Sequence, residues 1–515
     1  MKTSPFKANK MQTEVAKSHA LSIIEAIAVG ALAGFFAVLY RYLLGYASQW
    51  HTWLFSQNHL SFIAITIVTV ILMAWLTGYL LKRSPLSGGS GIPQVTGELL
   101  GQFNMPVLSL LLSKFVGGLF AIISGMSLGR EGPSIQIGAA VAKGYSKKRQ
   151  TSPEDTRLLI TAGAAAGLAA AFNAPIAASL FVLEEIHKSI SSFILIPALI
   201  SAILADLISK SLFGLQPSFA LKTPENFPLK LYFALIFLGI ASALIGYCFS
   251  KSLLALQTTM QKFFPKIIHR VMAGFLLAAF VSYGFSWITG SGHELVFDFI
   301  AHPFSLKLLL IILFAKIFFT AFCYSTGVPG GIFLPTLAIG CLSGASVFML
   351  IQLFLPIDSA LLTNFMVLGM VGVLTAVVRS PLTSIILVVE MVGNLNNLLP
   401  LAIVAALAYV ICERLGLAPI YESLYERMQD KSAAKLTKKK ISLTYQVSVL
   451  SQFNQLAVKD LAFPPSALLL NIERKGQSIT PHGDTTLQAL DTIKILLDED
   501  DLATSKKYIH SMNKD

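Results

Sequence analysis

A charged, glycine-broken segment lies between two long apolar runs and reads Gly129-Arg130-Glu131-Gly132-Pro133-Ser134-Ile135-Gln136-Ile137-Gly138. The apolar flanks place it at membrane depth, where an ionisable side chain is costly and is by default a functional-site hypothesis. Glu131 is therefore the first candidate residue. Gly132 and Pro133 interrupt an incoming helix, and Pro133 is suited to be the first residue of a new one.

A helix that begins inside the bilayer directs free backbone N–H groups and a positive dipole end at the residues before it. Such a helix start predicts an anion site with the Glu131 carboxylate beside it. The alternative interpretation is a re-entrant loop in which Arg130 and Glu131 pair with each other. The segment by itself does not decide between the two.

The composition assigns the chain to the polytopic membrane proteins. Of its 515 residues, 54% are hydrophobic and only 13% are charged, and the mean hydropathy is +0.69. Apolar runs such as 20–44, 61–81 and 229–253 are long enough to span a bilayer as helices. The sequence therefore predicts an all-α membrane protein.

The basic residues gather in three clusters, at 2–17, 147–149 and 435–440, and the net charge is +12. They are not spread as they would be on a nucleic-acid-binding face, and the positive-inside rule places them in the cytoplasm. Both termini are therefore expected there, and no signal peptide is evident. The four cysteines show neither pairing nor metal-ligand spacing, and no cofactor is expected.

An internal repeat relates residues 172–184 to residues 378–390, with a proline and a glutamate at the same spacing. The glutamates are Glu184 and Glu390, whereas Glu185 aligns with Met391. Apolar segments interrupted by glycine and proline at corresponding positions of two halves point to a transport site at the repeat interface. The broken segments 129–133 and 330–335 occupy such positions.

Four regions follow from this organisation. A polar N-terminal tail covers residues 1–19, and a transmembrane domain at 20–428 has halves at about 20–220 and 225–428. Residues 429–443 form a lysine-rich linker. Residues 444–515 form a small cytoplasmic α+β domain, with strands at 467–474 and 492–497, turns at 475–476 and 483–484, and a closing helix at 500–510.

Three broken motifs stand together: Gly89-Ser90-Gly91-Ile92-Pro93, Gly129-Arg130-Glu131-Gly132-Pro133 and Gly331-Ile332-Phe333-Leu334-Pro335. With the repeat, they closely resemble the CLC family of chloride channels and proton-coupled chloride transporters, over residues 20–428. The resemblance implies two inverted-topology halves with broken and re-entrant helices. It also implies one pore in each subunit and a homodimer.

The resemblance assigns anion-binding roles to five residues. Ser90 matches the anion-coordinating serine, with Gly91 in the same motif, and the backbone N–H groups of Ile332 and Phe333 match those that face the central anion. Tyr421 resembles the tyrosine whose hydroxyl closes the inner side of the site. Its other interpretation is an aromatic anchor at the membrane interface.

Two carboxylates carry the proton chemistry that the resemblance implies. Glu131 matches the gating glutamate, which competes with the anion until protonation removes its charge. Glu185 matches the inner proton-transfer glutamate, which channel members usually lack. Glu184 and Glu390 are interpreted as structural helix-end carboxylates, with a proton role as the alternative. Lys114 matches a basic residue near the pore, and a structural ion pair is the alternative.

The sequence thus predicts a chloride/proton antiporter of the cell membrane. A passive chloride channel of the same family is the alternative, and Glu185 discriminates between them. An intramembrane hydrolase would use Gly290-Ser291-Gly292-His293, although near neighbours in sequence rarely form a nucleophile and base pair. A non-transporting sensor would not need to keep both Glu131 and Glu185.

The C-terminal region resembles a TrkA-C (RCK-C) domain over residues 466–476, 479–485 and 490–493. Such domains pair with each other, and in some bacterial transporters they bind a small ligand such as cyclic di-AMP. The resemblance therefore implies a cyclic dinucleotide as a partner. A dimer-stabilising tail without a ligand is the other interpretation.

Overall fold

The computed structural model describes residues 5–57, 59–189, 191–219, 221, 226–433, 440–448, 451–474, 477–498, 501, 504–505 and 508, with the side chains of 5–22, 430–433, 440–441, 477 and 498 left out. The chain divides into two compact units, Met1–Glu426 and Arg427–Asp515. The first unit is helical and the second contains a small sheet.

Among its described residues, the first half of the helical unit contains eight α-helices, and a π-helical turn, Val182–His187, follows the seventh of them. They are α1 Pro5–Phe55, α2 Leu60–Arg83, α3 Ile92–Leu99, α4 Val107–Ile123, α5 Glu131–Arg149, α6 Pro153–Phe172, α7 Pro175–Phe181 and α8 Ser192–Phe213. Because α1 begins at Pro5, most of the polar tail predicted for residues 1–19 is the start of a helix.

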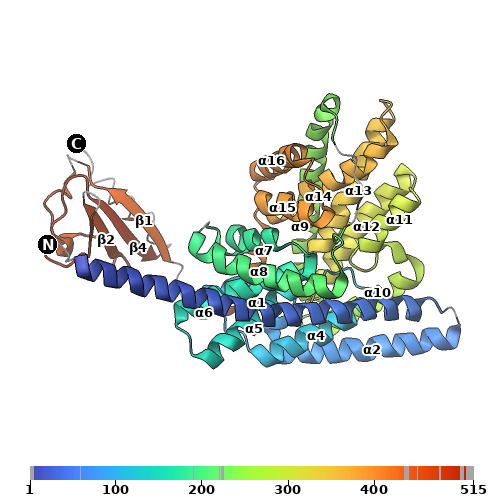
Figure 1. Cartoon of the computed structure of the whole chain (residues 1–515), viewed down its shortest axis with the longest axis horizontal. Coiled ribbons are helices and arrows are strands. Elements are labelled where there is room, and N and C mark those ends of the chain that lie inside the picture. The colour runs from blue at the N-terminus through green and yellow to red at the C-terminus, as the bar shows by residue number, and fades with distance from the viewer. Residues whose placement is uncertain are drawn as a thin grey trace. The chain divides into compact units, whose positions relative to one another are not determined.

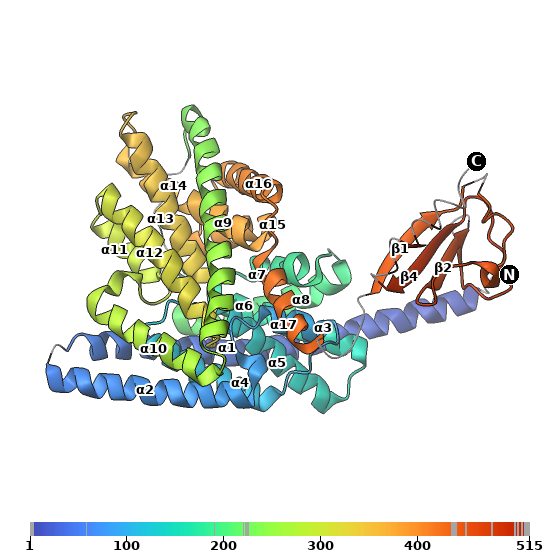
Figure 2. The ribbon, with the colours of Figure 1, turned by 180° about the vertical axis from the view of Figure 1, so that it is seen from behind.

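The second half repeats this order. It contains α9 Tyr232–Phe263, α10 Ile267–Gly284, α11 His293–Ala301, α12 Leu306–Ser325, α13 Phe333–Gln352, α14 Leu362–Val378, α15 Pro381–Val392 and α16 Leu398–Arg414, and α17 Ile420–Ala433 follows. Each helix from α1 to α8 has a counterpart from α9 to α16, and the two halves pack against each other (Figures 1 and 2). The internal repeat is therefore structural.

Two pairs of repeat-related helices cross at glycines. A Cβ atom at Gly163 of α6 would lie 2.4 Å from the carbonyl oxygen of Gly138 in α5, and one at Gly369 of α14 would lie 2.2 Å from that of Gly340 in α13. No side chain fits at such distances, so the backbones touch. Small residues that allow close backbone approach are the usual device for packing helices in membranes.

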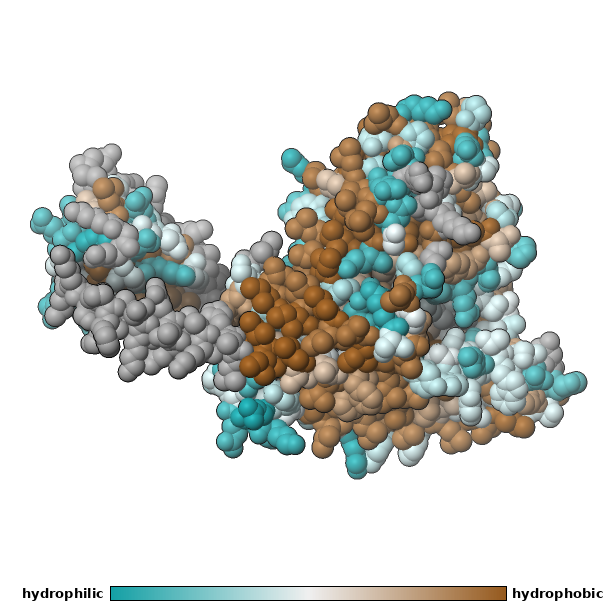
Figure 3. Space-filling view, viewed as in Figure 1, coloured by the Kyte–Doolittle hydropathy of each residue, from teal (hydrophilic) through white to brown (hydrophobic). Residues whose placement is uncertain are grey.

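Among the described residues, eight helical segments are long and apolar enough to cross a membrane. Three of them are Ile23–Phe55, Leu60–Arg83 and Ser359–Val378. These contain or overlap the apolar runs predicted at 20–44 and 61–81. Apolar side chains also lie on the outside of the unit, for example over α8, where Leu207 is 63% exposed (Figure 3). An outer surface of this kind suits a lipid environment.

Residues 290–292, which suggested a hydrolase, are the repeat copy of residues 89–91. The two glycines of each copy have positive φ, +63° and +96° in the first and +61° and +90° in the second. Lys114 Nζ donates to the carbonyl of the first glycine at 2.7 Å, and Lys316 Nζ does the same in the second copy at 2.8 Å. His293 bonds the Ser218 carbonyl at 3.0 Å.

The C-terminal unit has an antiparallel sheet in the order β1-β4-β2-β3. Its strands are β1 Lys440–Gln446, β2 Leu468–Arg474, β3 Gln477–Ile479 and β4 Thr492–Asp498. The strands predicted at 467–474 and 492–497 correspond to β2 and β4. The start of β1 lies inside the predicted linker at 429–443, because Leu443 and Tyr445 pack against the core of the sheet despite the lysines before them.

Two predictions for this unit lie mostly outside the described residues: the turn at 475–476 and the closing helix at 500–510. The turn at 483–484 is present. Arg474 and the buried Asp491 form a bidentate pair, with bonds of 2.8 and 2.7 Å. Burial raises the pKa of Asp491, but the hydrogen bonds from Arg474 outweigh it and leave that pKa below its ordinary value. The pair is therefore charged at neutral pH.

The glycine crossings yield the first prediction. Gly163→Ala and Gly369→Ala should each lower the free energy of unfolding by about 1–3 kcal/mol, because the added methyl group forces two packed backbones apart. Thermal unfolding of the purified protein in detergent measures the loss. Gly284→Ala is the control, since a Cβ atom there meets nothing within 4 Å. Equal stability of all three variants would contradict the proposed packing.

Candidate functional site

The two central motifs are joined by a pair of backbone hydrogen bonds. The N–H of Gly129 donates to the carbonyl of Gly331, and the N–H of Gly331 donates to the carbonyl of Gly129, each at 2.7 Å. The two residues form an isolated antiparallel bridge. The helices α5 and α13 each begin two residues after the bridge.

Each of these helices begins two residues before its motif proline. The sequence predicts Pro133 as the first helical residue, whereas α5 begins at Glu131 and α13 begins at Phe333, so that Pro133 and Pro335 are the third residues. A proline is tolerated throughout the first turn, because the N–H groups there have no partner inside the helix. Glu131 therefore belongs to the helix start itself.

Four helix starts meet around the bridge. A Cβ atom at Gly132 of α5 would lie 2.7 Å from the carbonyl oxygen of Ser90, which precedes α3. The ring of Phe333 in α13 stacks on that of Tyr421 in α17, with centroids 6.3 Å apart. The starts of α3, α5 and α13 have no side-chain cap. Their N–H groups, which have no acceptor inside the helix, and their positive dipole ends make this region suited to an anion.

Ser90 and Gly91 lie in the motif that opens α3. The Ser90 hydroxyl is fully buried and lies 3.4 Å from the N–H of Ile92 and 3.5 Å from the hydroxyl of Tyr324. Gly91 has φ of +96°, and a Cβ atom there would lie 2.5 Å from the Gln136 side chain. Both the conformation and the space therefore require glycine.

Ile332, Phe333 and Tyr421 lie together at the starts of α13 and α17. Ile332 is the N-cap of α13, and both it and Phe333 are buried. The Tyr421 hydroxyl is buried and has no hydrogen-bond partner among the described residues. It lies within electrostatic range of Glu131, Glu185 and Tyr324. A buried hydroxyl of this kind normally has a partner, so a donor is left for a ligand.

The Glu131 side chain is fully buried in the first turn of α5. A Cβ atom at Gly129 would lie 2.2 Å from Glu131 Oε2, so the carboxylate lies directly over the bridge. The N–H groups of Arg130 and Leu334 interact with it, but neither oxygen has a hydrogen bond of ordinary geometry among the described residues. No ion pair between Arg130 and Glu131 is found there either, contrary to the loop interpretation.

Glu185 lies in the π-helical turn after α7 and is 6% exposed. It accepts a hydrogen bond of 3.0 Å from the hydroxyl of Ser380, the N-cap of α15. Its repeat counterpart Met391 is fully buried and cannot carry a proton. The carboxylate is therefore an addition to the shared framework, and it lies near an ion pair between Lys188 and Glu422.

Glu184 and Glu390 are helix-end carboxylates, as interpreted from the sequence. Glu184 accepts from the N–H groups of Leu382 and Thr383 at the start of α15, at 3.3 and 2.8 Å. Glu390 accepts from the N–H groups of Ile176 and Ala177 at the start of α7, at 3.2 and 2.8 Å. Each repeat therefore caps a helix of the other.

The structure adds residues that the sequence analysis did not single out. Tyr324, in the last turn of α12, donates from its hydroxyl to Ser90 Oγ at 3.5 Å, and Gln136 Nε2 of α5 donates to the Leu86 carbonyl at 2.8 Å. Lys114, in contrast, was named from the sequence; it is fully buried, and its Nζ donates to the Gly89 carbonyl next to Ser90 rather than forming an ion pair among the described residues. The sequence contains a signal for this role, because Lys316 is the equivalent lysine of the second repeat and binds the equivalent carbonyl of Gly290.

Comparison with known proteins identifies relatives of the chain. Residues 73–413 match the family described as "Voltage gated chloride channel". The H(+)/Cl(-) exchange transporter ClcA of Vibrio parahaemolyticus is 33% identical over 421 residues, which are 79% of this chain and 89% of the relative. The protein of the same name from Citrobacter koseri is 32% identical over 80% of this chain and 90% of the relative.

Solved structures show the same fold. A slow cyanobacterial Cl⁻/H⁺ antiporter aligns with a TM-score of 0.74 and 29% identity, over 80% of this chain and 98% of that one. A CLC-type fluoride/proton antiporter aligns with a TM-score of 0.67 at 24% identity, over 82% of this chain and 98% of that one. The predicted fold class, a helical CLC-type membrane protein with a small α+β domain, is confirmed.

The reciprocal caps yield the second prediction. Glu184→Ala and Glu390→Ala should each lower the free energy of unfolding by about 1–2 kcal/mol, because each leaves N–H groups at a helix start without an acceptor. Thermal unfolding in detergent measures both. Glu294→Ala, at an exposed glutamate in the first turn of α11, is the control and should change little. A loss for only one of the two caps would contradict their equivalence.

Proposed function

The chain belongs to the voltage-gated chloride channel family, and we propose that it exchanges chloride for protons as an antiporter of the cell membrane, through a pore in each subunit. One observation carries this proposal. Two buried carboxylates, Glu131 and Glu185, lie within electrostatic range of the same unpartnered hydroxyl of Tyr421, where uncapped helix starts meet.

The anion is proposed to bind where those helix starts converge. The backbone N–H groups of Ile332 and Phe333, the Ser90 hydroxyl with Gly91, and the Tyr421 hydroxyl are the donors that would surround it. A dehydrated chloride ion accepts hydrogen bonds only, so such a set of donors replaces its hydration shell without supplying a competing negative charge. Fixed dipoles suit this task because they need no counter-ion.

Glu131 is proposed as the gate and Glu185 as the inner proton-transfer residue. An ionised Glu131 carboxylate competes with chloride for the same N–H groups, and protonation removes that competition. The proton must then reach the opposite side of the membrane by a route that chloride does not use. Glu185 supplies a second buried group that can hold it, and no repeat counterpart gives this residue a framework role.

The names of the relatives support an antiporter over a channel, since the transporters from Vibrio and Citrobacter and the cyanobacterial structure all carry an exchange activity in their names. From the resemblance, we also propose a homodimer.

The basic clusters at 2–17, 147–149 and 435–440 support cytoplasmic termini. The C-terminal unit is proposed to be a TrkA-C-like domain, which its small antiparallel sheet is compatible with.

The exchange proposal yields the third prediction. Liposomes containing the purified protein receive a chloride gradient without a proton gradient, and internal pH is followed together with chloride flux. Chloride should drive protons against their gradient. Glu185→Gln should reduce the coupled proton movement at least about tenfold while chloride still flows, because the amide cannot carry the proton. Glu184→Gln is the matched control and should stay coupled.

Chloride flux in the unmodified protein without proton movement would instead identify a passive channel, and Glu185 would then be a structural carboxylate. Loss of coupling in Glu184→Gln to the same extent would show that the assay reports the fold of the segment rather than a proton route.

The C-terminal unit yields the fourth prediction. Titration calorimetry of the full chain in detergent should show binding of cyclic di-AMP, with about one site for each C-terminal unit or for each pair of units. A chain that ends after residue 433 lacks the sheet and should show no binding heat. Absence of heat from the full chain would remove the ligand and leave the unit as a dimer-stabilising tail.

A further inference from the structure

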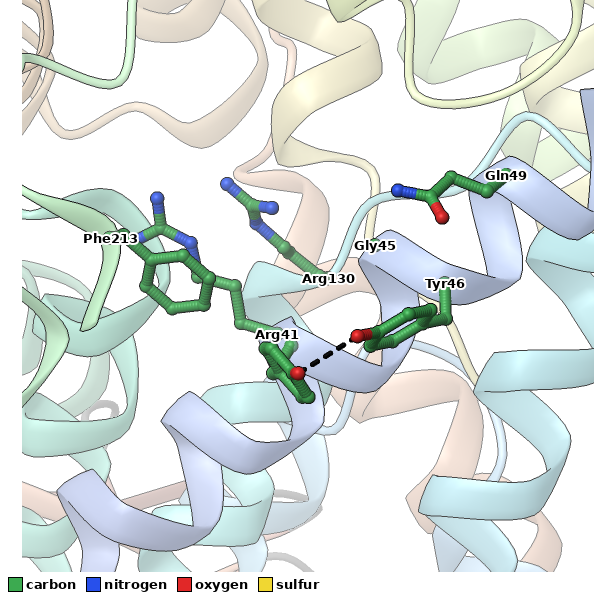
Figure 4. A pocket seen from close by; sticks show the side chains of 7 residues that line it. Arg41, Gly45, Tyr46, Gln49, Arg130 and Phe213 are labelled. Atoms are coloured by element: carbon green, nitrogen blue, oxygen red, sulfur yellow. Dashed lines mark hydrogen bonds between the residues drawn. The ribbon is translucent and has the colours of Figure 1, made fainter.

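A cavity of about 350 Å³ is lined by Arg130, the residue before Glu131, and contains two guanidinium groups (Figure 4). Arg41 contributes one from α1, and Arg130 contributes the other from the position just before α5. The remaining lining residues are Tyr42, Gly45, Tyr46, Gln49 and Phe213. None of the lining residues is acidic, so the cavity itself supplies no negative charge to pair with the two arginines.

Arg41 is held rigidly at the wall of this cavity. Its Nη1 donates to Asn173 Oδ1 at 2.7 Å and to Ser209 Oγ at 3.0 Å, and its guanidinium lies 4.1 Å from the centre of the Phe213 ring. Every hydrogen bond found for Arg41 among the described residues uses Nη1. The other N–H groups of the planar fork are therefore left for the cavity.

Arg130 has fewer partners still. Its Nε is buried and has no hydrogen-bond partner among the described residues. The guanidinium attracts the neighbouring Glu131 carboxylate and repels Arg41, and the field of both arginines extends to His293 at the start of α11. Two cations that face one cavity repel each other strongly when little water separates them.

The acidic groups nearby do not neutralise the pair. Asp206 interacts with Arg41 at a distance but is paired with Lys210 at 2.6 Å. Glu131 lies over the backbone bridge rather than in the cavity. An anion between the two guanidinium groups would relieve their repulsion and accept their free N–H groups, which is the usual chemistry of paired arginines.

We propose that this cavity is a second anion-binding site, in which Arg41 and Arg130 hold an anion beside Glu131. The binding itself does not require the proposed exchange. Its consequence for transport does rest on that function, because an anion held there is next to the carboxylate that admits it. The ligand is an anion from one of two sources, a halide from solution or the phosphate group of a lipid.

The lipid source is considered because Tyr42 and Tyr46 at the rim are 41% and 48% exposed, and their hydroxyls lie 2.9 Å apart. Exposed tyrosines are typical of the membrane interface, where lipid phosphates lie. The halide source is considered because the cavity adjoins Glu131. Both sources use the same donors, so one pair of variants tests both.

Gly45 allows a test that spares the fold. It lines the cavity, and a Cβ atom there meets nothing within 4 Å. Gly45→Asp places a carboxylate where the anion would lie, whereas Gly45→Asn adds a neutral side chain of nearly the same shape. In crystals of the full chain grown in bromide, Gly45→Asn should show anomalous bromide density between Arg41 and Arg130, and Gly45→Asp should not.

A second arm uses chain purified with phosphatidylglycerol in gluconate, without halide. Phosphate density between the same two arginines in Gly45→Asn, absent in Gly45→Asp, would support the site with a lipid as its source. Absence of density in both arms would overturn the proposal, as would bromide density at the arginines that Gly45→Asp leaves unchanged.

Transport gives the functional readout. The chloride concentration for half-maximal initial flux should rise about three- to tenfold in Gly45→Asp relative to Gly45→Asn, with the maximal flux unchanged, because the site raises the local anion concentration. Arg41→Gln should act in the same direction, and Arg83→Gln, at an exposed arginine of α2, should not. Exchange in the unmodified protein with no such shift would overturn the site's effect on transport, whereas density without exchange would overturn only the proposed function.

Discussion

The bond pair between Gly129 and Gly331 is the constraint on which the rest of the helical unit depends. A helix that stops inside apolar surroundings leaves backbone groups without partners, and water is not there to satisfy them. Here the extended residues of one repeat satisfy those of the other. The side chain of Glu131 covers the bridge so closely that no residue larger than glycine fits at position 129. Helix starts can therefore lie at the centre of the unit, with their N–H groups directed at a common region.

Other contacts are also shared between the two repeats. Several of the residues proposed to function in transport have no equivalent in the other repeat. Glu184 and Glu390 cap each other's helices, and Lys114 and Lys316 hold equivalent glycine carbonyls. Ser90 belongs to this shared framework through its copy Ser291, whereas three other transport candidates depart from it. Glu131 corresponds to Phe333, Glu185 corresponds to Met391, and Tyr421 belongs to a helix that follows both repeats. A framework that binds its own backbone symmetrically leaves the asymmetric side chains free for chemistry, and the buried oxygens of Glu131 and Tyr421 have no hydrogen-bond partner among the described residues.

The sequence predicted the fold well because glycine, proline and apolar length carry local physical meaning. The breaks at 88–93, 129–133 and 330–335, and the proline and glutamate of the repeat, all report backbone conformation where they stand. Contacts that join distant elements were not predicted. Tyr324 reaches Ser90 across 234 positions, and Arg41 reaches Asn173 across 132. The residues next to Tyr324 or Arg41 in the sequence do not predict either contact, because the partner of each side chain is determined by how distant helices pack. The strand at Lys440–Gln446 was missed because lysines hid its alternation.

The unpartnered state of the Glu131 carboxylate also bears on how a proton and an anion are coupled. If the carboxylate were held by a strong ion pair to Arg130, its charge would be stabilised whether or not an anion was present, and protonation would not respond to occupancy. With only weakly aligned N–H groups around it, the ionised form and the anion of the proposed exchange would draw on the same positive dipole ends. Each then weakens the other by the same free energy, because coupling between two binding events is reciprocal. Arg130, which forms no ion pair with Glu131 among the described residues, lines the cavity with Arg41, and in the proposed mechanism its positive charge would be available to an anion that approaches Glu131.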